Sequence, residues 1–243
     1  MISLERDGFH KFQLLSDQDL SSLKQRIRRQ WIDNITKNYP ESEKVLKFNQ
    51  IEIEDYHLYS HLIDHHNIWP KSSRMLSTED TNWFCQCESF NKLHSIIPSF
   101  SVSDEDSIDR PNFYWRLVRP NEANDIGPIH RDEWFWRLNS SFPRPIYPFE
   151  RLKLWISIHN EPLLNGLLVE AGSHLRNDII WSSELRHGIN KPIFSDANQT
   201  NLELVNTSPG DAILFHDRML HAGSINHGKK TRISLEFTLI IPI

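Results

Sequence analysis

Cysteine is scarce in this chain of 243 residues, which has only Cys85 and Cys87. A single residue separates the two, which is poor spacing for a disulfide and too short for the paired motifs of structural zinc. We therefore expect both to be ordinary free thiols.

Long apolar runs and an excess of positive charge are also lacking. No segment approaches the roughly 20 apolar residues of a membrane span, and the N-terminal segment 1–7 has no apolar run. The formal net charge of −5, with scattered lysine and arginine, argues against nucleic acid or a membrane surface as a partner. We expect a cytoplasmic protein that acts on a small-molecule substrate, and nothing indicates its oligomeric state.

The length suits one domain with a large core, which we assign to residues 1–243. Residues 1–100 are expected to be mostly helical support. After a short extended piece at Asp7-Gly8-Phe9, Ser16 caps a helix whose apolar residues recur every three or four positions. Further helices are expected at Asp55–His66 and at Ser77–Ile97, the latter with Phe84, Cys87, Leu93 and Ile97 inward.

From residue 112 onward the period changes to two, which is typical of strands. Strands are expected at 113–118, 152–159, 167–170, 202–205, 212–215 and 232–241. Helices followed by many short strands predict a mainly β, double-stranded β-helix (jelly roll, cupin-like) core over 112–243, braced by N-terminal helices.

One histidine-rich segment is not expected to bind metal. His57, His61 and His65 recur at four-residue steps, but the His-Glu-x-x-His arrangement is missing. A solvated helix face is the preferred interpretation.

The best metal-site pattern is His130-Arg131-Asp132. Residues two apart on a strand or its extension point the same way, so His130 and Asp132 can reach one ion. Two histidines and one carboxylate are the three ligands that suit iron(II) with open positions, and His221 is the candidate third ligand. A chance triplet on a loop and a satisfied core histidine are the competing interpretations.

A basic strand residue follows His221. Arg232 opens the last strand and faces the same way as Ser234, so its guanidinium can anchor the distal carboxylate of 2-oxoglutarate, with a hydroxyl added by Ser234. The competing interpretation is a surface arginine paired with Glu236 or Asp211.

These segments together resemble the phytanoyl-CoA dioxygenase-like family of iron(II)/2-oxoglutarate oxygenases. Besides His130-Arg131-Asp132, the resemblance rests on motifs spread along the chain: Leu154-Trp155-Ile156, Asn165-Gly166-Leu167, Ala171-Gly172-Ser173-His174, Pro209-Gly210-Asp211-Ala212 and Leu220-His221. It implies that His130, Asp132 and His221 hold Fe(II), that Arg232 meets 2-oxoglutarate, and that O2 oxidises a small molecule with release of succinate and CO2.

Other residues are assigned by weaker signals. Aromatic and basic side chains that can contact substrate are Tyr114, Arg131, Trp134, Trp136, Arg137 and Trp155, although the aromatic ones after Asp132 can equally fill the core as alternate members of a strand. His174 and His216-Asp217 are expected to be structural, and segments 121–126 and 179–199 are possible lids.

Two alternatives to a hydroxylating enzyme remain. A halogenase of the same fold has a small residue in place of the carboxylate, so Asp132 disfavours it. A non-catalytic metal-binding jelly-roll module has no use for a buried carboxylate anchor, so Arg232 disfavours that reading.

Overall fold

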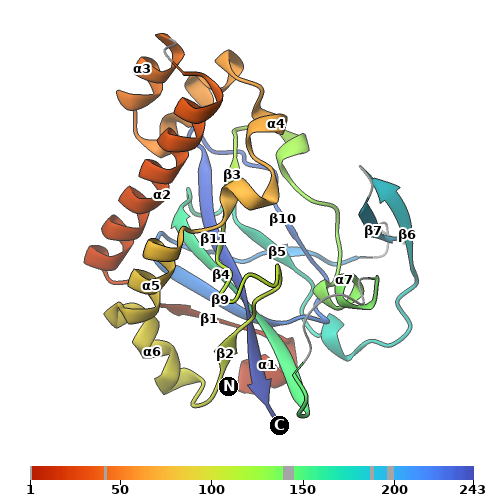
Figure 1. Cartoon of the computed structure of the whole chain (residues 1–243). Coiled ribbons are helices and arrows are strands. Elements are labelled where there is room, and N and C mark those ends of the chain that lie inside the picture. Colours follow the sequence, from red (N-terminus) through yellow and green to blue (C-terminus); the bar gives the residue numbers. More distant parts are fainter. Residues whose placement is uncertain (1, 41–42, 139–144, 187–188, 196–199) are drawn as a thin grey trace.

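The computed structural model describes residues 2–40, 43–138, 145–186, 189–195 and 200–243. Its centre is a six-stranded antiparallel sheet in the order β1-β9-β4-β11-β2, with β3 also paired to β11 (Figure 1). The strands of this sheet are β1 (Phe9–Gln13), β2 (Ser101–Val102), β3 (Tyr114–Val118), β4 (Phe149–His159), β9 (Asp211–His216) and β11 (Arg232–Pro242). A three-stranded sheet contains β10 (His221–Gly223), β5 (Leu167–Val169) and β8 (Glu203–Leu204).

These sheets confirm the predicted jelly-roll core with bracing helices. Each strand expected from the two-residue period is present, with bounds that differ by a few residues. The short strand β2 was not expected. Neither was the hairpin of β6 (Trp181–Arg186) and β7 (Ile189–Phe194), which lies in the segment that we interpreted as a possible lid. Residues 187–188 and 196–199 of that segment lie outside the described residues.

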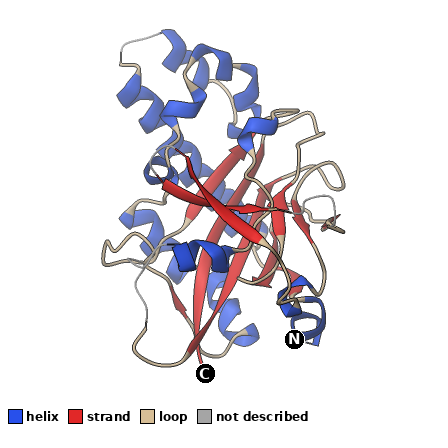
Figure 2. Cartoon of the chain, turned by 90° about the vertical axis from the view of Figure 1, so that its right-hand side faces the viewer, coloured by secondary structure: helices blue, strands red, loops and turns tan. Residues whose placement is uncertain are grey.

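Helices cover one face of the large sheet, as Figures 1 and 2 show. They are α2 (Asp17–Asn38), α3 (Glu43–Asn49), α4 (His65–Ile68), α5 (Thr78–Gln86) and α6 (Glu88–Ile96), with short 3-10 turns η1 (Ile53–Leu58), η2 (Ser60–Leu62) and η3 (Lys71–Arg74) between them. Four further short elements are α1 (Ile2–Asp7), η4 (Ala123–Asp125), α7 (Asp132–Leu138) and η5 (Ser173–Leu175). Among the described residues, no helix is both long and apolar enough to cross a membrane.

The helix α2 confirms the predicted cap and apolar stripe. The Ser16 hydroxyl accepts a hydrogen bond from the Asp19 backbone N–H at 3.2 Å, which satisfies one of the free donors of the first turn. The side chains of Leu23, Ile27 and Trp31 are fully buried, because their spacing places them on one side of the helix.

The two other helical predictions need correction. Segment 77–97 forms two helices, because the chain leaves the helical conformation at Cys87, whose sulfur accepts the Phe90 backbone N–H and caps α6. Segment 55–66 forms 3-10 turns and the start of α4. There His65 bonds to the Tyr56 hydroxyl (2.7 Å) and lies 3.2 Å from the Asp125 carboxylate, so it is not on a solvated face.

The alternation along β11 decides which face of the large sheet carries the site. Ile233, Leu235, Phe237 and Leu239 are fully buried in the core shared with the helices. Arg232 and Ser234 therefore point to the opposite face, towards the small sheet. The same apolar core includes residues of both 1–100 and 112–243, which supports our proposal of one domain.

Candidate active site

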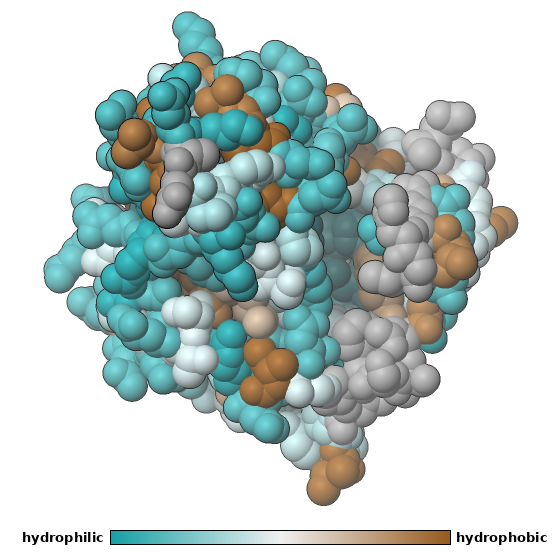
Figure 3. Space-filling view, turned by 45° about the horizontal axis from the view of Figure 1, so that its top comes forward, coloured by the Kyte–Doolittle hydropathy of each residue, from teal (hydrophilic) through white to brown (hydrophobic). Residues whose placement is uncertain are grey.

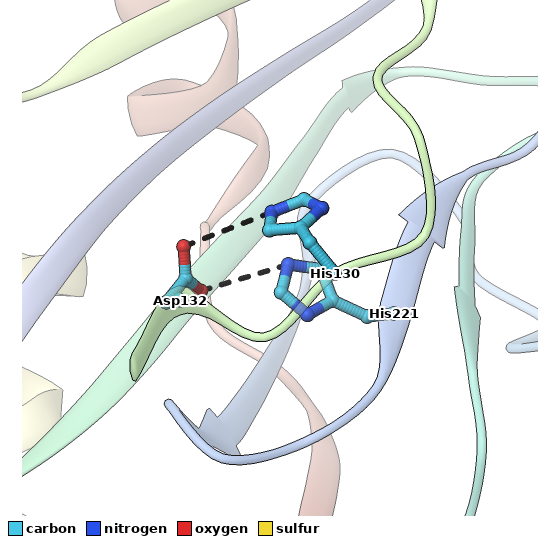
Figure 4. A group of neighbouring side chains, drawn as sticks. All are labelled: His130, Asp132 and His221. Atoms are coloured by element: carbon cyan, nitrogen blue, oxygen red, sulfur yellow. Dashed lines mark ion pairs between the residues drawn. The ribbon is translucent and has the colours of Figure 1, made fainter. Parts of the chain in front are cut away.

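The three candidate metal ligands lie close together between the two sheets (Figure 4). His130 Nε2 is 3.9 Å from one carboxylate oxygen of Asp132, and His221 Nε2 is 3.6 Å from the other. One ligand atom from each of the three residues lies within 4.8 Å of the others. The triad therefore presents two imidazoles and one carboxylate to a common point.

Backbone hydrogen bonds fix both imidazole rings. His130 and His221 form a two-way backbone bridge, with N···O distances of 3.1 and 3.0 Å. His130 Nδ1 lies 2.8 Å from the Pro128 carbonyl oxygen, and His221 Nδ1 lies 3.0 Å from the Met219 carbonyl oxygen. Because a carbonyl only accepts, each Nδ1 carries the proton, which leaves each Nε2 lone pair directed to the shared point.

The protonation states also suit a cation. Burial, followed by the neighbouring His221, lowers the pKa of His130 to about 4, so this ring is neutral at pH 7. Burial raises the pKa of Asp132, but Lys153 and the two histidines lower it more, so the carboxylate is ionised. Its Oδ2 is buried without a hydrogen-bond donor, as expected for an atom whose partner is a metal ion.

The local structure that brings the pair together differs from our prediction. We expected His130 and Asp132 to share one side of a strand. Instead, His130 bridges to β10, and Asp132 is the first residue of α7. The turn into this helix directs the carboxylate back towards both rings, so the spacing was informative although its structural explanation was wrong.

A cavity of about 100 Å³ adjoins the triad. Its walls come from the strands β3, β4, β5, β9, β10 and β11 and from segment 125–127. The wall residues include Arg116, Asp125, Ile126, Gly127, Lys153, Trp155, Leu167, Phe215, Gly223, Arg232, Ser234 and Glu236. Figure 3 shows a hollow, mostly hydrophilic in colour, between the body of the molecule and the part on the right that carries β6 and β7.

Arg232 is a buried cation without an acidic partner among the described residues. Its side chain donates to the carbonyl oxygens of Gly166 and Ser224, while its Nε has no partner. Burial and the charge of Arg116 lower the pKa of Arg232 to about 10, so the guanidinium stays charged at pH 7. A buried cation of this kind suits the carboxylate of a bound acid.

The competing interpretation of Arg232 as a surface ion pair does not fit the structure. Glu236 pairs with Arg116 at 2.5 Å, and Asp211 pairs with Lys11 at 3.4 Å. Arg232 itself is only 3 % exposed.

The guanidinium of Arg232 lies close to Gly223, where there is no side chain to displace it. A Cβ atom at residue 223 would lie 2.9 Å from Nη2 of Arg232, which is closer than such contacts normally are. With any other residue at this position, two residues after His221, the guanidinium of Arg232 would have to shift.

The proposed substrate residues lie in different places. Trp155 lines the triad cavity. The Tyr114 hydroxyl instead bonds to Asp106 at 2.8 Å, and Arg131 donates to the backbone carbonyl oxygens of Ser173 and Arg176. Neither Tyr114 nor Arg131 is among the residues that line this cavity.

The aromatic run after Asp132 also points elsewhere, because it is helical. Trp134 stacks on Trp181 of β6, with ring centres 5.3 Å apart. Trp136 is buried under the Arg151 guanidinium, and Arg137 is exposed and pairs with Glu133 at 2.7 Å. These residues attach α7 to its surroundings and do not line the triad cavity.

Three charged wall residues on the strands were not predicted: Arg116, Lys153 and Glu236. Each lies on the polar side of a strand whose alternation we had recognised, two positions from Val118, Trp155 or Ser234. The alternation alone does not show that the polar side of these strands faces the inside of the jelly roll and that their apolar side faces the helices.

His174 holds the N-terminal segment. His174 is buried, bonds to the Glu5 carbonyl oxygen and stacks on His216 with ring centres 4.9 Å apart. Gly8 lies so close to His174 that a Cβ atom there would clash with the ring. His174 and His216 are not part of the described triad.

Comparison with known proteins identifies the family. The family model for phytanoyl-CoA dioxygenase matches residues 4–234. The chain belongs to the phytanoyl-CoA dioxygenase family. The predicted resemblance is thereby confirmed, as is the expectation of an enzyme. No curated protein matches the chain.

Solved structures with the fold of this phytanoyl-CoA dioxygenase family member share little sequence with it. AviO1 from Streptomyces viridochromogenes Tue57 is 16 % identical with a TM-score of 0.58, and the alignment covers 99 % of this chain and 93 % of AviO1. EvdO2 from Micromonospora carbonacea var. aurantiaca, complexed with 2-oxoglutarate, is 13 % identical with a TM-score of 0.59, and the coverages are 99 % and 89 %.

The epimerase SnoN, in complex with Fe3+, alpha ketoglutarate and nogalamycin RO, is 14 % identical to this chain with a TM-score of 0.57. The coverages are 99 % of this chain and 81 % of SnoN. The groups bound in EvdO2 and SnoN agree with the iron and 2-oxoglutarate expected here.

Proposed function

We propose that this chain is an Fe(II)/2-oxoglutarate-dependent dioxygenase that oxidises a small molecule, with hydroxylation as the expected outcome and succinate and CO2 as co-products. The observation that carries the proposal is the meeting of two residue sets in one cavity. Two imidazoles and a carboxylate face a common point, and the buried Arg232, without an acidic partner among the described residues, lines the same space.

Each residue of the set has a separate task. His130, Asp132 and His221 would hold Fe(II), which leaves coordination positions for the cosubstrate and O2. Arg232 would orient the distal carboxylate of 2-oxoglutarate, and the hydroxyl of the buried Ser234 can donate to it. When bound, iron and 2-oxoglutarate supply the oxidising chemistry. The protein positions these groups and limits the access of water.

The carboxylate of Asp132 argues for oxygenation over halogenation. It lies between the two histidines and occupies the third ligand position, where a halogenase needs space for a halide. A metal module without oxygen chemistry is disfavoured by Arg232, because burying a cation without an acidic partner is costly unless a ligand compensates for it.

The test is anaerobic addition of Fe(II) and 2-oxoglutarate to the apoprotein. We expect the visible metal-to-ligand charge-transfer band of a chelated keto acid. His130→Ala and His221→Ala should abolish the band, whereas Arg137→Ala, an exposed residue of the neighbouring helix α7, should not change it. If the wild type gives no band at saturating concentrations, the proposal is wrong.

A further inference from the structure

A second cavity, of about 140 Å³, lies next to the triad cavity. Its walls come from the helical part, from β3 and from η4 and consist of His65, His66, Trp69, Arg74, Arg116, Leu117, Asn124 and Asp125. Arg116 and Asp125 line both cavities. The second cavity therefore shares part of its wall with the space beside the metal ligands.

The charges of the shared wall are compensated within the protein. Arg116 donates twice to one carboxylate oxygen of Glu236, at 2.8 and 2.5 Å. Asp125 accepts from Arg119 at 2.9 and 2.8 Å and lies 3.2 Å from His65. Neither group needs a ligand to balance its charge.

Arg74 is different, because no carboxylate among the described residues pairs with it. Its Nε donates to the Trp69 carbonyl oxygen at 3.0 Å and its Nη1 to the Trp115 carbonyl oxygen at 3.4 Å. Neutral carbonyls hold the guanidinium in place but do not cancel its charge. The nearby Arg116 is paired with Glu236, so Arg74 is the cation in this cavity that can favour a bound anion.

The position of Arg74 is fixed before any ligand binds. It ends the short turn η3, and its two carbonyl acceptors belong to the buried residues Trp69 and Trp115, whose rings meet edge to face with centres 5.3 Å apart. A cation held in this way loses little conformational freedom on binding. Its planar group matches a carboxylate or phosphate oxygen pair.

We propose that this second cavity binds the anionic group of an oxyanion-bearing small-molecule substrate, with Arg74 as the residue that recognises it. The reacting part of the substrate then extends past Arg116 and Asp125 towards the triad. Trp69 supplies an apolar wall beside the anion, which suits an acid with an adjoining apolar or planar portion. The identity of the cavity as a substrate site rests on the proposed dioxygenase function.

The experiment measures binding of phenylacetate, phenyl phosphate and the neutral control phenylacetamide by calorimetry. It uses the full chain loaded anaerobically with Fe(II) and saturating 2-oxoglutarate, so that Arg232 is already engaged. We expect saturable binding of at least one anion and much weaker binding of the amide. Comparison of the two anions shows whether the cavity prefers a carboxylate or a phosphate. Arg74→Gln should weaken the anion about tenfold or more, as expected for the loss of a charge-assisted hydrogen bond.

Lys71→Gln is the matched control, because it removes one positive charge from the same turn. Lys71 is exposed, pairs with Asp106 at 2.7 Å and does not line the cavity. The proposal is overturned if Arg74→Gln binds the anion as tightly as the wild type does. It is also overturned if Lys71→Gln loses as much anion affinity as Arg74→Gln, or if neither anion shows saturable binding. Thermal unfolding establishes that the variants are folded.

A parallel titration of the metal-free Arg232→Met variant separates the two proposals. If this variant binds the anion in an Arg74-dependent way and the wild type shows no charge-transfer band, the dioxygenase function is contradicted but the anion site is not. A normal band with no effect of Arg74→Gln would contradict only the anion site.

Discussion

Replacement of Arg232 by methionine tests the cosubstrate anchor directly. The change keeps a long side chain but removes the charge and all donors. In the wild type, the guanidinium is buried, donates to two backbone carbonyls and keeps its Nε without a partner. A hydrogen bond to a charged group contributes about 1.5–3 kcal/mol. Loss of one such bond therefore weakens 2-oxoglutarate binding about 10- to 150-fold.

The effect of this substitution on folding should be much smaller than its effect on binding. The carbonyl oxygens of Gly166 and Ser224 lose a donor, which destabilises the fold, but a buried cation without an acidic partner is also removed, which offsets part of that loss. Iron binding should remain, since Arg232 is not one of the three ligands.

The assay is an anaerobic titration of Fe(II)-loaded protein with 2-oxoglutarate, followed through the charge-transfer band. Arg232→Lys keeps the charge but not the planar pair of donors and should fall between wild type and Arg232→Met. Arg137→Met, on the exposed side of α7, is the control. Unchanged 2-oxoglutarate affinity in a folded Arg232→Met protein would refute the assignment of Arg232.

Three further predictions address the cavity wall, the core and the response to acid. Gly223→Ala should weaken 2-oxoglutarate binding several-fold and lower the melting temperature only slightly, because its Cβ atom would displace the end of the Arg232 side chain and not the backbone; equal affinity in the titration would contradict the close approach. Phe237→Ala should lower the free energy of unfolding by about 3–5 kcal/mol in urea denaturation and Phe237→Leu by less, since the ring is fully buried between sheet and helices. Burial and His174 lower the pKa of His216 to about 4, so protonation favours the unfolded chain and stability should fall as the pH drops from about 6.5 to 4. The decline should be shallower in His216→Phe, and an identical slope in both proteins would show that His216 does not contribute.

The sequence by itself determined the elements with strong periodicity. The cap at Ser16 and the apolar spacing of α2 follow from local geometry, as do the alternating strands β4 and β11. The candidate ligands could also be selected from the sequence, because the residue types that bind iron, and their order along the chain, do not depend on coordinates.

Predictions from local sequence periodicity were wrong where contacts with distant parts of the chain decide the conformation. The aromatic run after Asp132 suits a strand as well as a helix, and its burial against β6 and β7, far along the chain, accompanies the helix α7. His65 belongs to a histidine-rich segment that looks solvated, but the partner that buries it is Asp125, sixty residues later. Periodicity in a short window contains no information about such partners.

Only the tertiary structure decided which polar strand residues surround the site. A two-residue period separates the two faces of a strand but does not say which face is enclosed. Because helices cover the apolar face, the polar face of β3, β4 and β11 closes on the small sheet and brings Arg116, Lys153 and Glu236 to the triad cavity. The tertiary structure also decided that Arg74, beside that cavity, has no carboxylate partner among the described residues, because the fold places the carboxylates next to other cations.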